Sequence, residues 1–335
     1  MSTPAPAPSH RVDLAILASV AFASAFAAHL AAGDLSLGMF GARRLVLVAF
    51  FPLLFTICAS LVVVVVSLVR MRRFIDPSSQ RLDAGALLRS VWVNPLPGAA
   101  MALATGYGIT GCGNLVEIYR ARATVFHDAA LWRIEGALFE RLLASPLNVP
   151  LFWDRVYFSF WAFLFAAMAY LYWEGRRTAV VRFMLVSILS FHLMRVLALF
   201  FPTAGPVFFH PELFRLDGTL SAGAQAMLRL YMRGEAPQNG ILPGTTAMPS
   251  LHVGLLALGI GLLGREHPKT LPWTLPFLAA TWAATVFLGW HYILDGIGGI
   301  ALAGVTLVLA IGILRAGHAL ARTLAARQAS GGAAA

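Results

Sequence analysis

The sequence is poor in charged residues and in cysteine. Only 12% of its 335 residues are charged, whereas a soluble domain carries about 25%. The two cysteines, Cys58 and Cys112, both lie in apolar runs, which argues against a disulfide framework and a cysteine-based metal cluster. Lys269 is the only lysine, so arginine supplies almost all of the net charge of +10. With 59% hydrophobic residues, the chain is predicted to be a membrane protein with several spans.

Eight apolar runs predict an all-α polytopic membrane protein with about eight transmembrane helices, because a helix needs about 20 residues to cross a bilayer. The runs cover residues 13–32, 45–69, 91–112, 156–173, 183–201, 250–264, 273–288 and 291–314. The first run is also compatible with a cleaved signal peptide, but the single Arg11 before it, offset by Asp13, favours a retained helix. Glycine and proline interrupt the third run, where a re-entrant segment is the alternative.

Arginine is concentrated in alternate connections, which predicts the side of the membrane that each one occupies. The loop at 70–90, the link at 174–182 and the tail from residue 315 are basic, so the positive-inside rule assigns them to the cytoplasm. Arg43 and Arg44 are the exception. This rule accounts for the basic residues without a nucleic-acid partner. We predict an integral protein of the cell (inner) membrane with both termini in the cytoplasm.

Residues 114–155 differ from the apolar runs, because acidic and basic side chains are balanced there. Apolar side chains recur at helical spacing at Leu131, Ile134, Leu138 and Leu142. The pattern predicts an extracytoplasmic amphipathic helix that lies on the membrane surface. A solvated helix that caps the bundle explains the pattern equally well.

Two histidines each open an apolar run. His252 stands in Pro-Ser-Leu-His-Val-Gly at 249–254, and His291 begins His-Tyr-Ile-Leu-Asp at 291–295. His291 and Asp295 are four apart, which on a helix puts them on one face within reach of a carboxylate–imidazole hydrogen bond. The predicted topology assigns both histidines and Asp295 to the extracytoplasmic end of their runs.

These residue types suit phosphoryl chemistry. An imidazole whose second nitrogen donates to a carboxylate can attack phosphorus, which makes His291, with Asp295, a candidate nucleophile. His252 could protonate the departing oxygen. Ser250 stands at a good N-cap position, where a helix N-terminus would present N–H groups to a phosphate.

The two motifs resemble the second and third signatures of the type 2 phosphatidic-acid phosphatase superfamily, and most closely those of its inositol phosphorylceramide synthase branch. That branch has Pro-Ser-Leu-His, then His-Tyr-x-x-Asp followed by small residues, here Gly298 and Gly299. Phe-Pro-Thr-Ala-Gly-Pro at 201–206 resembles its first signature, with Gly205 where a proline is expected. The resemblance covers roughly the second half of the chain.

The resemblance implies a phosphohistidine mechanism without a metal or other cofactor. In it His291 is the nucleophile, Asp295 its orienting partner and His252 the general acid. The phosphate-binding candidates are Ser250, Arg195 and Pro206. Two departures concern the phosphate clamp: the Ser-Arg pair that typical members carry before the nucleophilic histidine is Ala284 and Thr285 here, and the first signature lacks its Lys and Arg. Arg195, inside a predicted span, is either the clamp or a structural partner; Arg215, Arg229 and Arg233 are alternatives.

The chain is accordingly predicted to have four parts. Residues 1–12 form a disordered tail, and residues 13–90 hold two accessory transmembrane helices and the basic loop. Residues 91–314 form the catalytic membrane domain with a six-helix phosphatase-like core, and residues 315–335 form a cytoplasmic tail.

We therefore predict an integral-membrane lipid phosphotransferase that moves a phosphorylated head group between membrane lipids. A lipid-phosphate phosphatase with water as acceptor shares the intermediate and is the alternative. Two weaker alternatives are zinc held by His252, His291 and Asp295, and a transporter or scaffold with the histidines in a proton path. The transporter is disfavoured because the ionisable groups cluster at one membrane face. The sequence names neither the lipids nor the oligomeric state.

Overall fold

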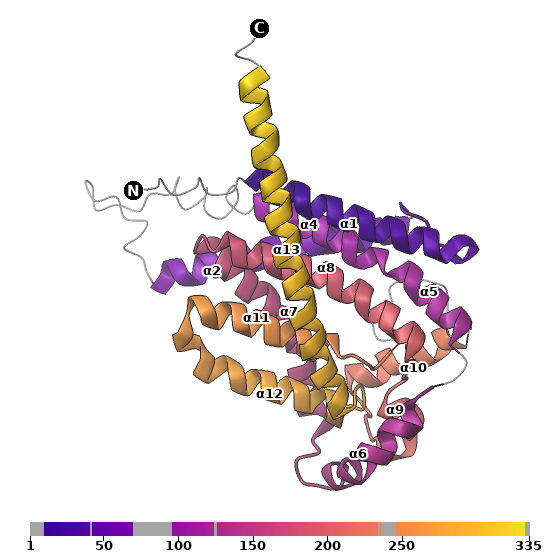
Figure 1. The fold of residues 1–335 in the computed structure, drawn as a ribbon. Coiled ribbons are helices and arrows are strands. Elements are labelled where there is room, and N and C mark those ends of the chain that lie inside the picture. The colour runs from indigo at the N-terminus through magenta and orange to yellow at the C-terminus, as the bar shows by residue number, and fades with distance from the viewer. Residues whose placement is uncertain are drawn as a thin grey trace.

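The computed structural model describes residues 10–40, 42–69, 96–123, 126–233, 235 and 246–331 of the chain. Within these ranges all regular secondary structure is helical, without a strand, which confirms the predicted all-α class. Figure 1 shows the helices packed into one body, from which the end of the C-terminal helix projects. The basic loop at 70–90 and most of the predicted N-terminal tail lie outside the described residues.

The described residues form twelve α-helices. In chain order these are α1 (His10–Ala32), α2 (Ala42–Val69), α4 (Leu96–Gly111), α5 (Gly113–Arg122), α6 (Asp128–Leu143), α7 (Pro150–Trp173), α8 (Arg177–Phe200), α9 (Pro206–Phe209), α10 (Leu220–Met232), α11 (Leu251–Glu266), α12 (Leu271–Phe287) and α13 (Ile293–Gly331). Short 3-10 helices lie between them: η1 (Gly33–Leu35), η4 (Pro211–Leu213) and η5 (Pro268–Thr270).

Five helical segments of the described chain are long and apolar enough to cross a membrane. They are Arg11–Leu35, Arg44–Val62, Pro150–Trp173, Arg177–Phe200 and Ile293–Gln328, and they coincide with five of the eight predicted runs. The other three runs contain α4, α11 and α12, which have only 16, 16 and 17 residues. At a rise of about 1.5 Å per residue, these helices are shorter than the hydrocarbon core of about 30 Å. Over its described part, the run at 91–112 forms a single helix up to Gly111 without a re-entrant turn.

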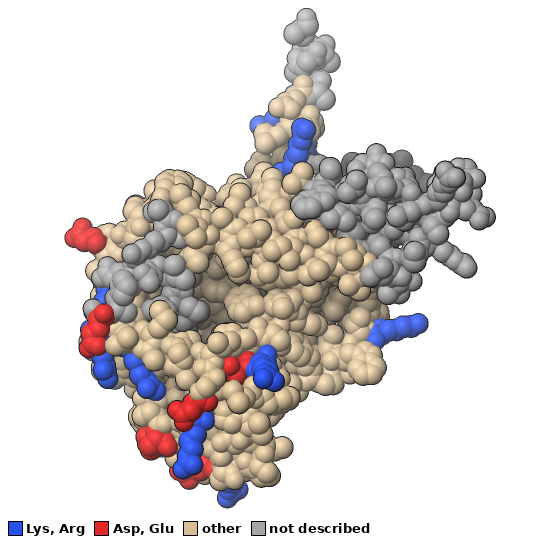
Figure 2. Space-filling view, turned by 180° about the vertical axis from the view of Figure 1, so that it is seen from behind, with Lys and Arg blue, Asp and Glu red and all other residues tan. Residues whose placement is uncertain are grey.

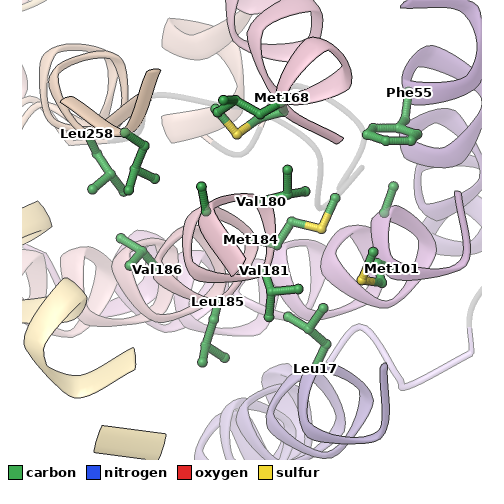
Figure 3. Packing of buried hydrophobic residues seen from close by; sticks show 14 of the residues in the cluster. Leu17, Phe55, Met101, Met168, Val180, Val181, Met184, Leu185, Val186 and Leu258 are labelled. Atoms are coloured by element: carbon green, nitrogen blue, oxygen red, sulfur yellow. The ribbon is translucent and has the colours of Figure 1, made fainter. Parts of the chain in front are cut away.

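The first helices belong to the core of the bundle. Leu17 of α1, Phe55 of α2, Met101 of α4 and Leu185 of α8 are buried in one cluster (Figure 3). Close packing of this kind is what associates helices in a membrane, where no hydrophobic effect acts between them. Leu17, in the first predicted run, thus lies in one cluster with residues of α2, α4 and α8.

Asp13 joins three helices at one end of the bundle. Its buried carboxylate accepts hydrogen bonds from Arg177 of α8 at 2.7 Å and from His318 of α13 at 2.9 Å. A separate ion pair of 3.3 Å joins Arg176 to Glu266 at the end of α11. Arg177 belongs to the link at 174–182 and His318 to the tail from residue 315, so two segments that the topology assigns to the cytoplasm do meet.

Helices α11 and α13 pack with their backbones in contact. A Cβ atom on Gly299 would lie 2.0 Å from the carbonyl oxygen of Ser250, and one on Gly254 would lie 2.3 Å from the carbonyl oxygen of Gly299. Small residues permit this close approach between membrane helices. The contact lies near the start of both helices and brings the two histidine motifs together.

The final helix is longer than predicted. It continues to Gly331, past the expected end of the span near Leu314, because alanine and arginine in this segment favour a helix. Figure 2 shows most charged side chains on the visible face along one side and in the lower part, with a few on the projecting helix and at the opposite edge, whereas the upper middle is uncharged. An uncharged surface of this kind suits contact with lipid.

Candidate active site

The structure brings His252 and His291 together. Nδ1 of His252 lies 3.3 Å from Nε2 of His291, and Nδ1 of His291 lies 2.7 Å from the carbonyl oxygen of Ala247. A carbonyl only accepts, so Nδ1 of His291 carries a proton. In neutral rings His252 then donates to Nε2 of His291, and the Tyr157 hydroxyl, 2.8 Å away, donates to Nε2 of His252. Nε2 of His291 therefore carries the lone pair that a nucleophile needs, and in this arrangement it accepts the hydrogen bond from His252.

Asp295 contacts His291 less directly than the spacing predicts. One carboxylate oxygen lies 3.6 Å from Nδ1 of His291 and accepts the N–H of Tyr292 at 2.8 Å. His291 precedes α13 instead of lying on it, because the chain turns at Gly289, which has φ of 69°. The carbonyl of Ala247 receives the hydrogen bond instead, and the fully buried carboxylate is close enough to act on the ring through its charge.

A cavity of about 140 Å³ lies beside the two histidines. Arg195 of α8, only 3% exposed, is the one Lys or Arg side chain among the described residues that line it. Its guanidinium matches a phosphate in charge and in the geometry of its donors. Aromatic and aliphatic side chains form most of the remaining wall, including Tyr157, Phe158, Phe160, Trp161, Phe191, Met194, Leu251, Leu255 and Trp290.

The other two phosphate-binding candidates lie outside the cavity wall. Ser250 is fully buried, and its hydroxyl caps α11 by accepting the N–H of Val253 at 3.5 Å, as its position predicts. Pro206 is buried at the start of α9. Arg195 is therefore the candidate that the geometry favours for phosphate contact.

The loop at 201–206 requires glycine where a proline was expected. Gly205 has φ of 107°, and its N–H donates to Asp128 at 2.8 Å. Proline has φ near −65° and no N–H, so it fits neither condition. Asp128 also accepts the N–H of Ala204 at 2.8 Å, so one buried carboxylate fixes this loop.

Helix α6 holds the start of α13 in place next to the site, a role that the sequence pattern did not predict. Its buried Glu135 accepts the N–H groups of Ile293 at 2.7 Å and Leu294 at 2.8 Å, which caps the N-terminus of α13. Burial raises the pKa of the Glu135 carboxyl, and the two N–H groups oppose this effect. Of the apolar residues predicted to share one face of α6, Leu131 is buried, whereas Ile134 and Leu138 are 70% and 45% exposed. The position of this helix on the membrane surface stays a prediction.

Tyr157 is the site residue that the sequence did not reveal. It directly precedes the aromatic stretch Phe158–Phe165, and no spacing distinguishes it. Its ring stacks on Trp290 with centroids 5.9 Å apart. Trp290 is the neighbour of His291 in the sequence, so the two rings form one wall of the cavity beside the histidines.

His252, His291 and Asp295 are of residue types that can bind a metal ion. Among the described residues, however, no group of three or more His, Cys, Asp or Glu side chains is arranged to hold a metal ion.

A family model described as the PAP2 superfamily matches residues 127–309, which is more than half of the chain and includes all six predicted site residues. No curated protein and no solved structure matches the chain.

Proposed function

Because this chain belongs to the PAP2 superfamily of membrane phosphatases and phosphotransferases, we propose that it is a lipid phosphotransferase that moves a phosphorylated head group between lipids. Membership confirms the superfamily predicted from the motifs. The inositol phosphorylceramide synthase branch is part of the proposal. The observation that carries the proposal is the pair of histidines, 3.3 Å apart, beside a mainly apolar cavity that also holds Arg195.

In the first proposed step, Nε2 of His291 attacks the donor phosphorus. A nitrogen–phosphorus bond forms while the bond from phosphorus to the leaving lipid oxygen breaks. Protonated His252 gives its Nδ1 proton to that oxygen, which departs as an alcohol. The carboxylate of Asp295 stabilises the positive imidazole ring of His291, and Arg195 stabilises the charge on the phosphoryl oxygens.

In the second proposed step, a hydroxyl of the acceptor lipid attacks phosphorus. His252 removes the hydroxyl proton, the nitrogen–phosphorus bond breaks, and His291 returns to its neutral form. Water in place of the alcohol would give hydrolysis. The aromatic and aliphatic wall of the cavity disfavours water, which supports transfer over hydrolysis.

We further propose that the site faces away from the cytoplasm. The support is that Arg177 and His318, from segments assigned to the cytoplasm, meet at Asp13, while the histidines stand at the opposite ends of their runs. A cysteine-specific, membrane-impermeant reagent applied to intact cells tests this: Arg141→Cys, exposed in the last turn of α6, should react, whereas Arg322→Cys should not.

The function is tested with purified protein in detergent and a phospholipid radiolabelled in its head-group phosphate. A chelator is present, and ceramide and diacylglycerol are offered as acceptors. Label in a new lipid supports the transferase, whereas label released only as inorganic phosphate from a phosphomonoester lipid supports the phosphatase. His291→Ala and His252→Ala should each lower activity by about a thousandfold or more, while His210→Ala, outside the cavity, should not. Normal turnover in either site variant would refute the mechanism.

A further inference from the structure

A second cavity adjoins the candidate active site. It measures about 50 Å³ and lies between α2, α4, α7, α8 and α11. Trp161, Phe191 and Leu255 line both cavities, so the two spaces adjoin at these side chains.

Both hydroxyl side chains among the described residues that line the second cavity are already hydrogen-bonded. They are Thr105, which donates to the carbonyl oxygen of Met101 at 2.8 Å, and Ser187, which donates to that of Phe183 at 2.8 Å. Every other lining side chain is aromatic or aliphatic or is a methionine. An apolar space of this kind stays dry and takes apolar ligands.

Three of the lining residues come from three helices. Figure 3 shows Phe55 of α2, Met168 of α7 and Met184 of α8 on different sides of this region. Methionine is unbranched and fills irregular gaps, so Met168 and Met184 can repack around a flexible guest. The wall is therefore able to adapt to a hydrocarbon chain.

Two of the helices that form the cavity lie outside the segment matched by the family model. Phe51 and Phe55 of α2, and Ala102, Thr105 and Ile109 of α4, precede residue 127. Helices α2 and α4 thus close one side of the second cavity.

We propose that this second cavity binds part of one acyl chain of the lipid substrate, and that α2 and α4 determine which chain lengths are accepted. The proposal rests on the proposed function, because it takes the head group of the same lipid to lie beside His252 and His291. Each methylene group that enters an apolar site instead of water changes affinity by about fourfold. Chain selectivity should therefore depend on residues remote from the reacting phosphate.

The first test compares dihexanoyl and dioleoyl forms of the donor lipid with wild type and Thr105→Phe. The larger side chain fills part of the cavity, so the ratio of kcat/KM for the long donor to that for the short donor should fall about fourfold per excluded methylene group. Leu103→Phe, on the same helix with Leu103 46% exposed, should keep the wild-type ratio. An unchanged ratio in Thr105→Phe would overturn the proposal.

The second test needs no turnover. Wild-type protein is illuminated with phosphatidic acid that carries a diazirine on one acyl chain, and the labelled residues are located by mass spectrometry. Label on Phe51, Phe55 or Thr105 that excess unlabelled phosphatidic acid removes supports the site. Label confined to outward residues such as Phe50 and Leu53 would overturn it. Labelling of the cavity without turnover of any donor would refute the proposed function but leave the acyl-chain site standing.

Discussion

The hydrogen bonds at the site run in one direction, from Tyr157 through His252 and His291 to Ala247. This direction follows from the carbonyl of Ala247, which can only accept. The hydroxyl of Tyr157 can donate to neutral His252 and accept from its protonated form. Tyr157 is therefore suited to position His252 in both steps of the proposed reaction.

Tyr157→Phe should lower kcat by about tenfold while changing KM less, because a hydrogen bond to a buried group is worth about 1–3 kcal/mol. The limb of the pH–rate profile that reports His252 should also move. Steady-state kinetics across pH checks this. Tyr170→Phe makes the same change elsewhere on α7 and should behave as wild type; equal effects of the two variants would contradict the role of Tyr157.

Arg195→Gln should lower kcat/KM by about a hundredfold to a thousandfold, the usual cost of losing one donor to a developing anion. The matched control is Arg229→Gln, since Arg229 is exposed on α10 and does not line the cavity of the histidines. The measurement is kcat/KM in the lipid assay. A loss of less than fivefold in Arg195→Gln would remove Arg195 from the phosphate site.

At the scale of elements, the periodicity of apolar residues predicted where helices form but not which other segments each helix contacts. The amphipathic pattern correctly marked α6. It did not reveal that Asp128 and Glu135 hold the loop at 201–206 and the start of α13, because those contacts span about 76 and 158 residues of sequence. The sequence revealed the two histidines because each stands in a short recognisable motif. It did not reveal Tyr157, because the hydrogen bond between Tyr157 and His252 forms only when α7 packs against α11.

The glycine contact between α11 and α13 should be sensitive to a single methyl group. Gly299→Ala would put a Cβ 2.0 Å from the carbonyl oxygen of Ser250, and overpacking of this kind costs about 1–3 kcal/mol. Both the unfolding temperature in detergent and the activity should fall. Gly304→Ala, on the same helix with open space around it, should be neutral or slightly stabilising. Similar unfolding temperatures for both variants would contradict the claim that the contact between α11 and α13 has no room for a methyl group.

At the scale of the whole molecule, hydropathy predicted the polytopic class and the charge pattern predicted which segments meet. The hydropathy runs at 250–264 and 273–288 match α11 and α12 to within two residues at each end. Hydropathy ended the last helix too early, near Leu314. The end of a helix depends on caps and packing that hydropathy does not report.

Asp13 should be a stabilising link between the accessory helix α1 and the matched family segment. Asp13→Asn removes the charge that faces Arg177 and His318 and should cost about 1–3 kcal/mol, less than a fully buried pair because Arg177 is 22% exposed. The unfolding temperature in detergent should fall while kcat per folded molecule is kept. Asp34→Asn, remote in sequence and exposed, is the control; no difference between the two would contradict the link.

The central claim is that His291 forms a covalent bond to the transferred phosphoryl group. The most direct measurement mixes purified protein with a donor radiolabelled in its head-group phosphate, without an acceptor, quenches the mixture in alkali within one turnover, and locates the label by mass spectrometry. The account predicts label on His291 and none in His291→Ala. Label on any other residue, or turnover without labelled protein, would contradict it.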